Sequence, residues 1–447
     1  MSNTRPTKAR ATVLYHAYSA LTRLALPFAY RKVARKLADA GVSAPRIRER
    51  LGYATLPRAN DRLVWFHAAS VGESLSILGL INRMRAASPD LAFLITSGTA
   101  TSAAILAKRM PEGCVHQFAP LDSAPVLRRF LAHWQPDLAV FVESELWPQM
   151  LALSHQNGTP LVLLNARLSA GSVKNWQRFG KTARYLLGLF SLIIAQTDET
   201  TDHLRTLGAN PDTLRTGQDL KAIAGALPYD DAALDTLKTT LGNRPIWVAS
   251  STHKGEEEQV LDAHKRVLAD FPDALLILVP RHPERAPEIL ELLKSSGLNY
   301  TQRTKDDPIT SHTQIYLADT LGETGLWYAL APIVFLGGSL MPVGGHNPFE
   351  PAYAGATVLF GPHITNMTGI YQRFETAGGC QKITSGSSLA NALLALLSNS
   401  DTLAISCENS RDFALSQQDA LAPIIDDLFA RLNNANTTPF NSQDAHA

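Results

Sequence analysis

The sequence predicts an α/β protein built from two Rossmann-like domains, and three observations lead to that prediction. The chain has 447 residues, enough for two or three domains. Its 45% apolar and 18% charged residues exclude a disordered or collagen-like chain. Short apolar runs alternate with segments of helical length, which is typical of parallel sheets covered by helices on both faces.

Two series of candidate strands follow one another along the chain. The first series comprises 63–67, 92–96, 115–118, 138–142, 161–165 and 192–195. The second series comprises 246–250, 275–279, 314–317, 333–336 and 357–360. A hydrophilic stretch at about 208–231 separates them. Because ligands of parallel sheets bind beyond the carboxyl ends of the strands, we expect the active site in a cleft that the two domains face.

These patterns divide the chain into four segments. We expect a basic helical segment at 1–50, one Rossmann-like domain at 51–215 and a second at 216–428. The polar residues of 429–447 predict a disordered tail.

The overall charge of +1 conceals a strongly basic N-terminus. Residues 1–50 hold 11 basic and two acidic residues, whereas the rest of the chain holds 30 basic and 38 acidic residues. Residues 11–30 are mostly apolar, but His16, Arg23 and Pro27 interrupt them, so no uncharged run reaches the ~20 residues that span a bilayer. A cleavable signal peptide fits poorly because most of the basic residues follow the apolar stretch.

Apolar residues in this stretch recur at helical spacing, at Val13, Ala17, Leu21, Leu24 and Phe28. The spacing is typical of a helix that lies in the membrane interface. A cluster of cations that could bind anionic lipid head groups follows: Arg31, Lys32, Arg35, Lys36, Arg46, Arg48 and Arg50. Periodicity alone equally allows the helix to dock on its own domain.

Cysteine and histidine usage argues against a metal centre. The three cysteines are widely spaced, at Cys114, Cys380 and Cys407. They form neither a disulfide framework nor a Cys-x-x-Cys pair, which favours a reducing compartment. Four histidines lie in polar loops, at His67, His253, His282 and His346. No two of them have the spacing of helical metal ligands, so we expect hydrogen-bonding roles and no metal.

Polar residues follow the predicted strands of the first half. Glu73 lies in the first turn of a helix that follows small residues, where a carboxylate could act as a general base or merely complement the helix dipole. Glu143 and Glu145 follow another strand beside Trp147, and two neighbouring acids favour a functional role. Arg167 follows a further strand and could meet an anionic group.

The loops of the second half are more typical of a nucleotide site. Segment 250–257 combines hydroxyls with a glycine at a predicted helix start, which could bind an anion. Arg281 follows the next strand and could pair with a phosphate or a base edge. A polar turn occupies 319–323.

The glycine-rich loop at 337–351 is the strongest of these signals. We expect its N–H groups to bind a phosphate. Asn347 is suited to cap a helix that begins at Pro348, and Glu350 could accept both hydroxyls of a ribose.

Five of these segments together resemble the 3-deoxy-D-manno-octulosonic acid (Kdo) transferases of Gram-negative bacteria: 69–73, 143–148, 165–169, 280–285 and 344–350. The resemblance extends from the N-terminal helix to about residue 425. It implies a GT-B glycosyltransferase, with two Rossmann-like domains facing a cleft and an amphipathic, membrane-associated N-terminal helix. It further implies inverting transfer of Kdo from CMP-Kdo to the lipid A precursor (lipid IVA) in lipopolysaccharide biosynthesis.

The resemblance also implies partners and a location. The enzyme would work as a peripheral or monotopic protein at the cytoplasmic side of the inner membrane. Its partners would be CMP-Kdo, the lipid A precursor and the anionic membrane surface, with no nucleic acid. No cofactor or metal is implied besides the donor.

Residue by residue, the resemblance implies an acceptor role for the first domain and a donor role for the second. Glu73 matches the general base, and one of Glu143 and Glu145, with Lys221, matches positions that stabilise the transition state. Residues 217–223 lack the aromatic and the following acid that the family has around this lysine. The CMP-binding segments match Pro280, Arg281, Leu321, Gly322, Glu323, Asn347, Pro348, Phe349 and Glu350.

Two other functions remain open from the residues. A GT-B transferase could use another nucleotide sugar, because a fold does not fix its substrate. A non-catalytic scaffold that binds a nucleotide sugar would not require Glu73.

Overall fold

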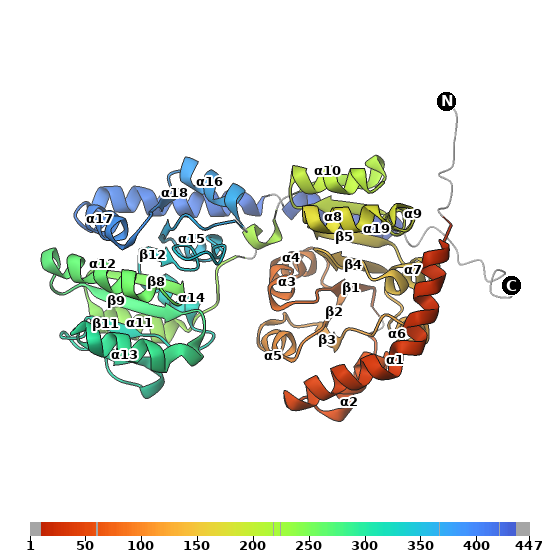
Figure 1. Cartoon of the computed structure of the whole chain (residues 1–447), viewed down its shortest axis with the longest axis horizontal. Helices are drawn as coiled ribbons and strands as arrows, with labels where there is room; N and C mark the ends of the chain where they lie inside the picture. Colours follow the sequence, from red (N-terminus) through yellow and green to blue (C-terminus); the bar gives the residue numbers. More distant parts are fainter. Residues whose placement is uncertain are drawn as a thin grey trace. The chain divides into compact units, whose positions relative to one another are not determined.

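The chain folds into two compact units, each built on one parallel sheet. The computed structural model describes residues 10–59, 61–217, 219–223, 225–365, 367–419 and 421–434, with only the backbone at 221, 223 and 418. The first unit runs to residue 224 and resumes at residue 420, and the second holds residues 225–419. Each contains a seven-stranded sheet, so the predicted α/β architecture of two Rossmann-like domains is confirmed (Figure 1).

The sheet of the first unit has the strand order β3-β2-β1-β4-β5-β6-β7. Its strands are β1 (Leu63–His67), β2 (Ala92–Ser97), β3 (Cys114–Phe118), β4 (Leu138–Val142), β5 (Leu161–Ala166), β6 (Leu192–Ala195) and β7 (Leu214–Thr216). Every residue of β1 and β4 is buried because helices cover both faces. The strand order reverses between β1 and β4, and ligands of such sheets bind at this switch point.

Helices of the first unit lie on both faces of its sheet, α3 and α5 on one and α6 and α7 on the other (Figure 1). The helices are α1 (Val13–Asp39), α2 (Ala44–Ile47), η1 (Arg48–Leu51), α3 (Val71–Ser76), α4 (Leu78–Ala87), α5 (Ala100–Arg109), α6 (Ala124–Trp134), α7 (Pro148–Gln156), α8 (Ala170–Gln177), α9 (Gly180–Leu187), α10 (Asp198–Thr206), η2 (Pro211–Thr213), η3 (Leu220–Ile223) and α19 (Leu421–Asn434).

Helix α6 shows how the sequence secures these helices. Its apolar residues Val126, Leu127, Phe130 and Trp134 form one buried stripe at helical spacing. Burial of each large side chain contributes about 1.5–3 kcal/mol. Trp134 also donates its indole N–H to Gln117 at 2.7 Å, so the polar edge of the ring is satisfied inside the core.

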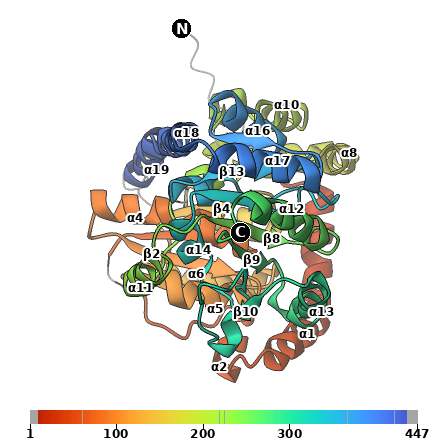
Figure 2. The same ribbon diagram turned by 90° about the vertical axis from the view of Figure 1, so that its left-hand side faces the viewer.

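The sheet of the second unit has the order β10-β11-β9-β8-β12-β13-β14, with its switch point between β8 and β12. Its strands are β8 (Ile246–Thr252), β9 (Leu275–Pro280), β10 (Tyr300–Gln302), β11 (Ile315–Leu317), β12 (Ile333–Leu336), β13 (Thr357–Phe360) and β14 (Cys380–Lys382). Its helices are α11 (Asp231–Leu241), α12 (Glu257–Asp270), η4 (Pro283–Arg285), α13 (Ala286–Ser296), η5 (Arg303–Lys305), α14 (Thr324–Leu330), α15 (Phe349–Tyr353), α16 (Thr368–Thr376), α17 (Gly386–Leu397) and α18 (Ser400–Gln418). Helices α12 and α17 lie side by side (Figure 2).

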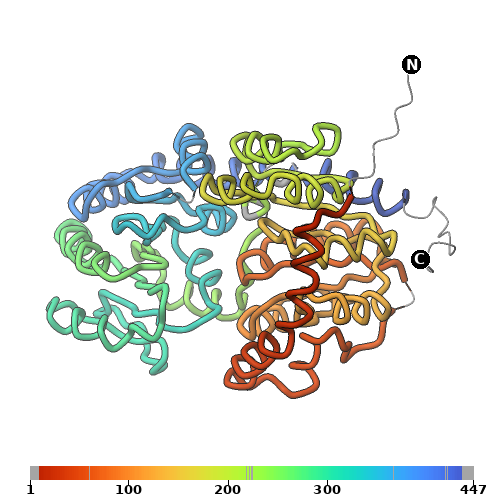
Figure 3. The backbone as a smooth tube through the Cα atoms, turned by 45° about the vertical axis from the view of Figure 1, so that its right-hand side comes forward, coloured from red at the N-terminus to blue at the C-terminus, as the bar shows by residue number. Residues whose placement is uncertain are grey.

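Helix α1 docks on the first unit (Figure 3). It still exposes an apolar stripe. On the docked side Tyr15 packs against Tyr185 with ring centroids 5.4 Å apart, and Tyr18 donates its hydroxyl to Asp122 at 2.9 Å. The predicted stripe faces away from the unit, with these exposed fractions: Val13 87%, Leu21 64%, Leu24 76% and Phe28 73%. Within the described residues, no helix has the length and apolar character needed to cross a bilayer.

The predicted cluster of cations is only partly available to a membrane. Arg46 forms an ion pair with the buried carboxylate of Glu49 at 3.2 Å, and Arg50 donates to the carbonyl of Ala119. Burial lowers the pKa of Arg50 to about 10. Because both cations satisfy groups inside the unit, they are removed from the predicted lipid-binding cluster. The cations of α1 are exposed: Arg31, Lys32, Arg35 and Lys36.

The chain returns to the first unit after residue 419, whereas the sequence predicts a second domain that continues to 428. Helix α19 buries Leu428 and Leu432 and packs on α4. Asp427 of this helix forms an ion pair with Arg215 at 2.6 Å. Residues 429–434, predicted as part of a disordered tail, are therefore helical because their apolar side chains find a partner. Residues 435–447 lie outside the described part of the chain.

Candidate active site

Glu73 lies at the carboxyl edge of the first sheet, in the first turn of α3. Ser70 caps this helix by accepting the N–H of Glu73 at 3.3 Å. In return the Glu73 carboxylate accepts the Ser70 hydroxyl at 2.7 Å and the N–H of Ala69 at 2.9 Å. The reciprocal bonds fix the carboxylate at the helix start, as in a capping box. The side chain stays half-buried rather than enclosed.

The surroundings of Glu73 shift its proton affinity upward. Burial raises the pKa of Glu73, the bonds from Ser70 and Ala69 oppose that rise, and the charges of Glu143 and Glu145 add to it. The net pKa is above the usual value. The fold thus brings the three predicted carboxylates within reach of one another's electric field.

Glu145 lies at the end of a hydrogen-bonded chain that begins in the core. Trp65 donates its indole N–H to the Thr96 hydroxyl oxygen at 2.8 Å, and that oxygen lies 2.9 Å from Nδ1 of His67. Nε2 of His67 lies 3.2 Å from Oε2 of Glu145, which also accepts the indole N–H of Trp147. If His67 donates at Nε2 and accepts the Thr96 hydroxyl at Nδ1, every group in the chain has a partner.

These hydrogen bonds shift the pKa of Glu145 in the direction opposite to that of Glu73. Burial alone would raise the pKa of Glu145, but the hydrogen bonds from His67 and Trp147 lower it below the usual value. Neighbouring acids whose surroundings move their pKa values apart are suited to different roles in proton transfer. Glu145 is the acid that stays ionised, and Glu73 is the stronger base.

Two loops of this edge are held in left-handed backbone conformations. Glu143 has φ 60° and Asn165 has φ 56°, which costs a non-glycine residue about 1 kcal/mol or more and is common at functional sites. The buried Asn165 accepts the N–H of Leu220 at 3.2 Å and thereby fixes the start of η3. Lys221 lies in η3, but its side chain falls outside the described residues. Arg167 is exposed after β5.

In the second unit a buried carboxylate organises the glycine-rich loop. Glu256 has 0% exposure, and its oxygens accept four backbone N–H groups: His253 at 2.9 Å, Gly338 at 2.7 Å, Ser339 at 3.0 Å and Leu340 at 2.9 Å. The first part of the loop therefore cannot offer these amides to a phosphate, contrary to the sequence prediction. A carboxylate of the chain itself occupies the position expected for the anion.

Three of the predicted loop histidines meet beside this loop. Nε2 of His253 lies 3.0 Å from Nε2 of His346, so one ring donates and the other accepts. His282 contacts His253 edge to face, with ring centroids 5.8 Å apart. Burial and the charge of Arg281 lower the pKa of His346 to about 4, which keeps the ring neutral. A Cβ on Gly338, at φ 64°, would lie 2.9 Å from His346, so the loop requires glycine there.

The ends of β8 and β9 and the start of α15 also converge. The buried hydroxyl of Tyr328 lies 2.9 Å from Ser250. Its pKa is raised by burial and by the charge of Glu350, while Arg281 opposes the rise. Arg281 and Glu350, both predicted to bind the nucleotide, therefore act on the same buried group. Within the described residues no group of three histidine, cysteine or acidic side chains is arranged to hold a metal ion, and the predicted absence of a metal remains a prediction.

Two predicted nucleotide-binding residues have structural partners. Phe349 is fully buried against Phe374, with ring centroids 4.9 Å apart, so only its backbone can meet a ligand. Glu323 accepts both Nε and Nη2 of Arg303, at 3.1 and 2.6 Å, and this pair lowers the pKa of Glu323. Leu321, by contrast, is 83% exposed.

The turn into α15 differs from the prediction by one residue. Asn347 accepts the N–H of Phe349 at 3.1 Å, as a capping side chain does, and the helix begins at Phe349 instead of Pro348. The shift leaves Glu350 in the first helical turn. Pro280 ends β9, directly before Arg281.

Comparison with known proteins connects this geometry to one family. Residues 45–224 match the family model described as 3-deoxy-D-manno-octulosonic-acid transferase. The chain is 37% identical to the 3-deoxy-D-manno-octulosonic acid transferase of Rickettsia felis over 80% of this chain and 77% of that one. It is 34% identical to the transferase of Haemophilus influenzae, over 81% and 86% of the two chains. It is 32% identical to the probable mitochondrial transferase of Arabidopsis thaliana, over 89% and 91%.

Solved structures share the fold at lower sequence identity. The S. aureus MnaA structure with UDP aligns over 85% of this chain and 99% of that one, with 15% identity and a TM-score of 0.55. The UDP-GlcNAc 2-epimerase of Neisseria meningitidis aligns over 82% and 100%, with 12% identity and a TM-score of 0.56. At this level of identity the likenesses show a shared fold alone.

The role of Glu256 can be tested by substitution. Glu256→Ala leaves four buried N–H groups without their acceptor, so we expect a loss of at least about 3 kcal/mol in the free energy of unfolding. Urea unfolding of the full chain, followed by circular dichroism, measures the loss. Glu258→Ala, at an exposed position of α12, is the matched control and should change little. Equal stability of the two variants would contradict the assigned role.

Proposed function

The chain belongs to the 3-deoxy-D-manno-octulosonic acid transferase family, and from that membership we propose that it moves Kdo from CMP-Kdo to the lipid A precursor with inversion. The observation that carries the proposal is the opposite pKa shift of two neighbouring carboxylates, Glu73 and Glu145. A non-catalytic scaffold would have no use for such a pair, because binding alone does not require a base.

In the proposed reaction Glu73 acts as the general base. The ionised carboxylate accepts the proton of an acceptor sugar hydroxyl while the hydroxyl oxygen attacks the anomeric carbon of Kdo. The bond from that carbon to the CMP phosphate oxygen breaks, and its electron pair leaves with CMP. A raised pKa makes the ionised Glu73 a stronger base than an ordinary glutamate, which favours this proton transfer.

We assign the donor to the second unit. Arg281 is exposed at the end of β9 and can pair with the phosphate of CMP, on which negative charge develops as the bond breaks. Glu350, in the first turn of α15, is assigned to the ribose hydroxyls. Because Glu256 occupies the amides of residues 338–340, phosphate recognition falls to Arg281 and to the later part of the loop.

Other residues stabilise the reaction or complete the site. We assign Lys221 and one of Glu143 and Glu145 to transition-state stabilisation, and His67 to positioning Glu145. Pro280, Leu321, Gly322 and the segment 347–349 are assigned to the walls of the nucleotide site. We propose that the reaction needs no metal or further cofactor.

We further propose that the protein works as a peripheral protein at the cytoplasmic side of the inner membrane. The apolar stripe of α1 is exposed although the helix docks on its own unit, which supports a second partner for that stripe. The exposed cations of the same helix add attraction to anionic lipids of about 1 kcal/mol each. The acceptor, a lipid, would be met at that surface.

Substitution of the base tests the mechanism. We expect Glu73→Gln to lower kcat by roughly 10²- to 10⁴-fold, the usual contribution of a general base, while KM for CMP-Kdo changes little. Glu112→Gln, at an exposed position of the same unit, is the matched control. The measurement is product formation from CMP-Kdo and lipid A precursor. Undiminished turnover by a folded Glu73→Gln protein would refute the role of Glu73.

The pH dependence of the reaction tests the electrostatic account. Because the base must be ionised, kcat/KM should fall as the pH drops through the raised pKa of Glu73. Glu143→Gln removes a negative charge that raises this pKa, so the acidic limb should move to lower pH. The pH at which kcat/KM falls is independent of the maximum value that kcat/KM reaches. A limb that stays in place or moves to higher pH would contradict the account.

Membrane attachment can be tested on the exposed stripe. Leu21→Gln/Leu24→Gln/Phe28→Gln replaces exposed apolar side chains, so the protein should fold and bind vesicles at least about tenfold more weakly. Co-sedimentation with vesicles that contain phosphatidylglycerol measures the affinity. Ile405→Gln/Leu415→Gln alters exposed residues of α18 and is the control. Equal vesicle affinity of both variants would remove α1 from the attachment.

A further inference from the structure

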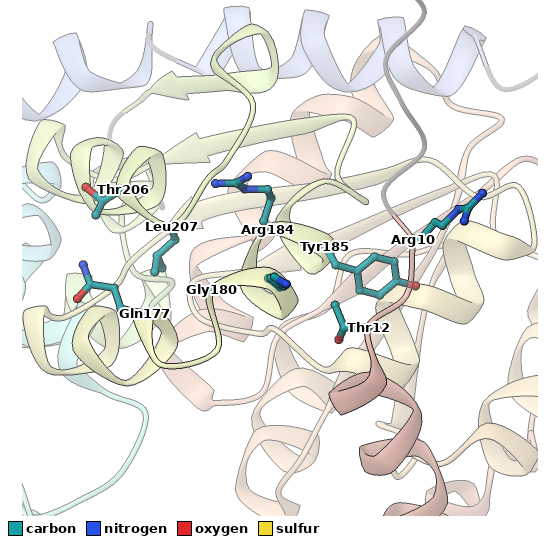
Figure 4. A pocket seen from close by; sticks show the side chains of 9 residues that line it. Arg10, Thr12, Gln177, Gly180, Arg184, Tyr185, Thr206 and Leu207 are labelled. Atoms are coloured by element: carbon teal, nitrogen blue, oxygen red, sulfur yellow. The ribbon is translucent and has the colours of Figure 1, made fainter.

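A cavity of about 570 Å³ opens in the first unit where α1 begins, apart from the residues assigned to the reaction. The start of α1, the first turns of α9 and the end of α10 line it (Figure 4). The residues that matter here are Arg10, Thr12, Gly180, Lys181, Arg184 and Tyr185. Helix α8 leads from Ser169, which follows β5, to Gln177 in the cavity wall, so about 12 Å of helix separate these two residues.

The cavity is cationic and lacks acidic side chains. Arg10, Lys181 and Arg184 line it, and no aspartate or glutamate does. In the part of the chain that the structure describes, none of the three cations forms an ion pair. Three cations that share a concave surface without a counter-charge favour an anionic ligand. A phosphate, with several oxygens, matches this donor set best.

The walls of the cavity are held in place. The Thr12 hydroxyl lies 2.8 Å from that of Thr182 on α9 and also caps α1 by accepting the N–H of Tyr15 at 3.2 Å. Tyr185 packs against Tyr15 and directs its hydroxyl toward Arg10 (Figure 4). Gly208 gives Arg184 its room, because a Cβ there would lie 2.7 Å from the guanidinium.

Exposed apolar side chains border the cations. Val13 follows Thr12 directly and is 87% exposed, and Phe179 precedes Gly180 and is 50% exposed. The apolar stripe of α1 continues from this point. A free phosphorylated metabolite would gain nothing from such a border, whereas a membrane lipid presents a phosphate next to hydrocarbon.

We propose that this cavity binds the phosphate of an anionic membrane lipid, with Lys181 and Arg184 pairing with its oxygens and Val13 and Phe179 meeting its acyl region. The inference deepens the proposed attachment to the membrane and rests on it. It adds a defined head-group site to the diffuse attraction of the exposed cations of α1.

The test measures the affinity of the full-length protein for vesicles of phosphatidylglycerol and phosphatidylcholine. Lys181→Gln/Arg184→Gln should bind roughly tenfold to thirtyfold more weakly than the unaltered protein. Lys265→Gln/Arg266→Gln, which removes the same charges from exposed positions of α12, should bind as the unaltered protein does. Gly180→Phe places a bulky ring in the cavity without a change of charge, and its Cβ meets no atom within 4 Å, so it should also weaken binding.

The outcomes separate a site from general electrostatics and from a soluble ligand. Unchanged affinity of both cavity variants would overturn the proposal, and so would weak binding by the charge variant together with full binding by Gly180→Phe. If inorganic phosphate binds strongly in the cavity while the cavity variants keep full affinity for vesicles, the ligand is a soluble phosphate and the proposal is overturned. Transfer of Kdo to detergent-dispersed acceptor should persist in the cavity variants. Failure of the cavity proposal is therefore distinguishable from failure of the proposed reaction.

Discussion

Parallel pairing of every strand is the constraint on which the rest of the structure depends. In each unit all seven strands end at the same edge of the sheet, so residues that are far apart in sequence become neighbours there. Glu73 follows β1 and Glu145 follows β4, the two strands that flank the switch point. In the second unit the switch point lies between β8 and β12, and Glu256 and the glycine-rich loop follow these strands.

Three glutamates at these edges differ in role because their surroundings differ. Glu256 is enclosed by four N–H donors and holds a loop in place. Glu145 is held ionised by His67 and Trp147. Glu73 also accepts two hydrogen bonds, but its burial and the charges of its acidic neighbours outweigh them, so it binds a proton more readily. The residue type alone therefore does not assign a role, whereas the burial, the donors and the charges around each carboxylate do.

The sequence predicts the positions of the strands well, but it does not predict which distant groups the site residues contact. Every predicted strand is present with its ends shifted by at most two residues, because burial on both faces gives a continuous apolar run. The strands β7, β10 and β14 were not predicted, because each has three residues, partly polar, and is stabilised mainly by pairing with a neighbour. Their composition and the resemblance to the family are enough to identify the site loops from the sequence. The hydrogen bonds that Glu256 accepts from amides some eighty residues away cannot be predicted, because no local sequence pattern indicates them.

Mass spectrometry of the lipid product tests the proposed transfer most directly. Purified full-length protein is incubated with CMP-Kdo and detergent-dispersed lipid A precursor, and the masses of the lipid products are read by mass spectrometry. We expect lipid that is heavier by whole Kdo units, with one CMP released for each unit added. Unmodified lipid, or release of CMP without a heavier lipid, would contradict it.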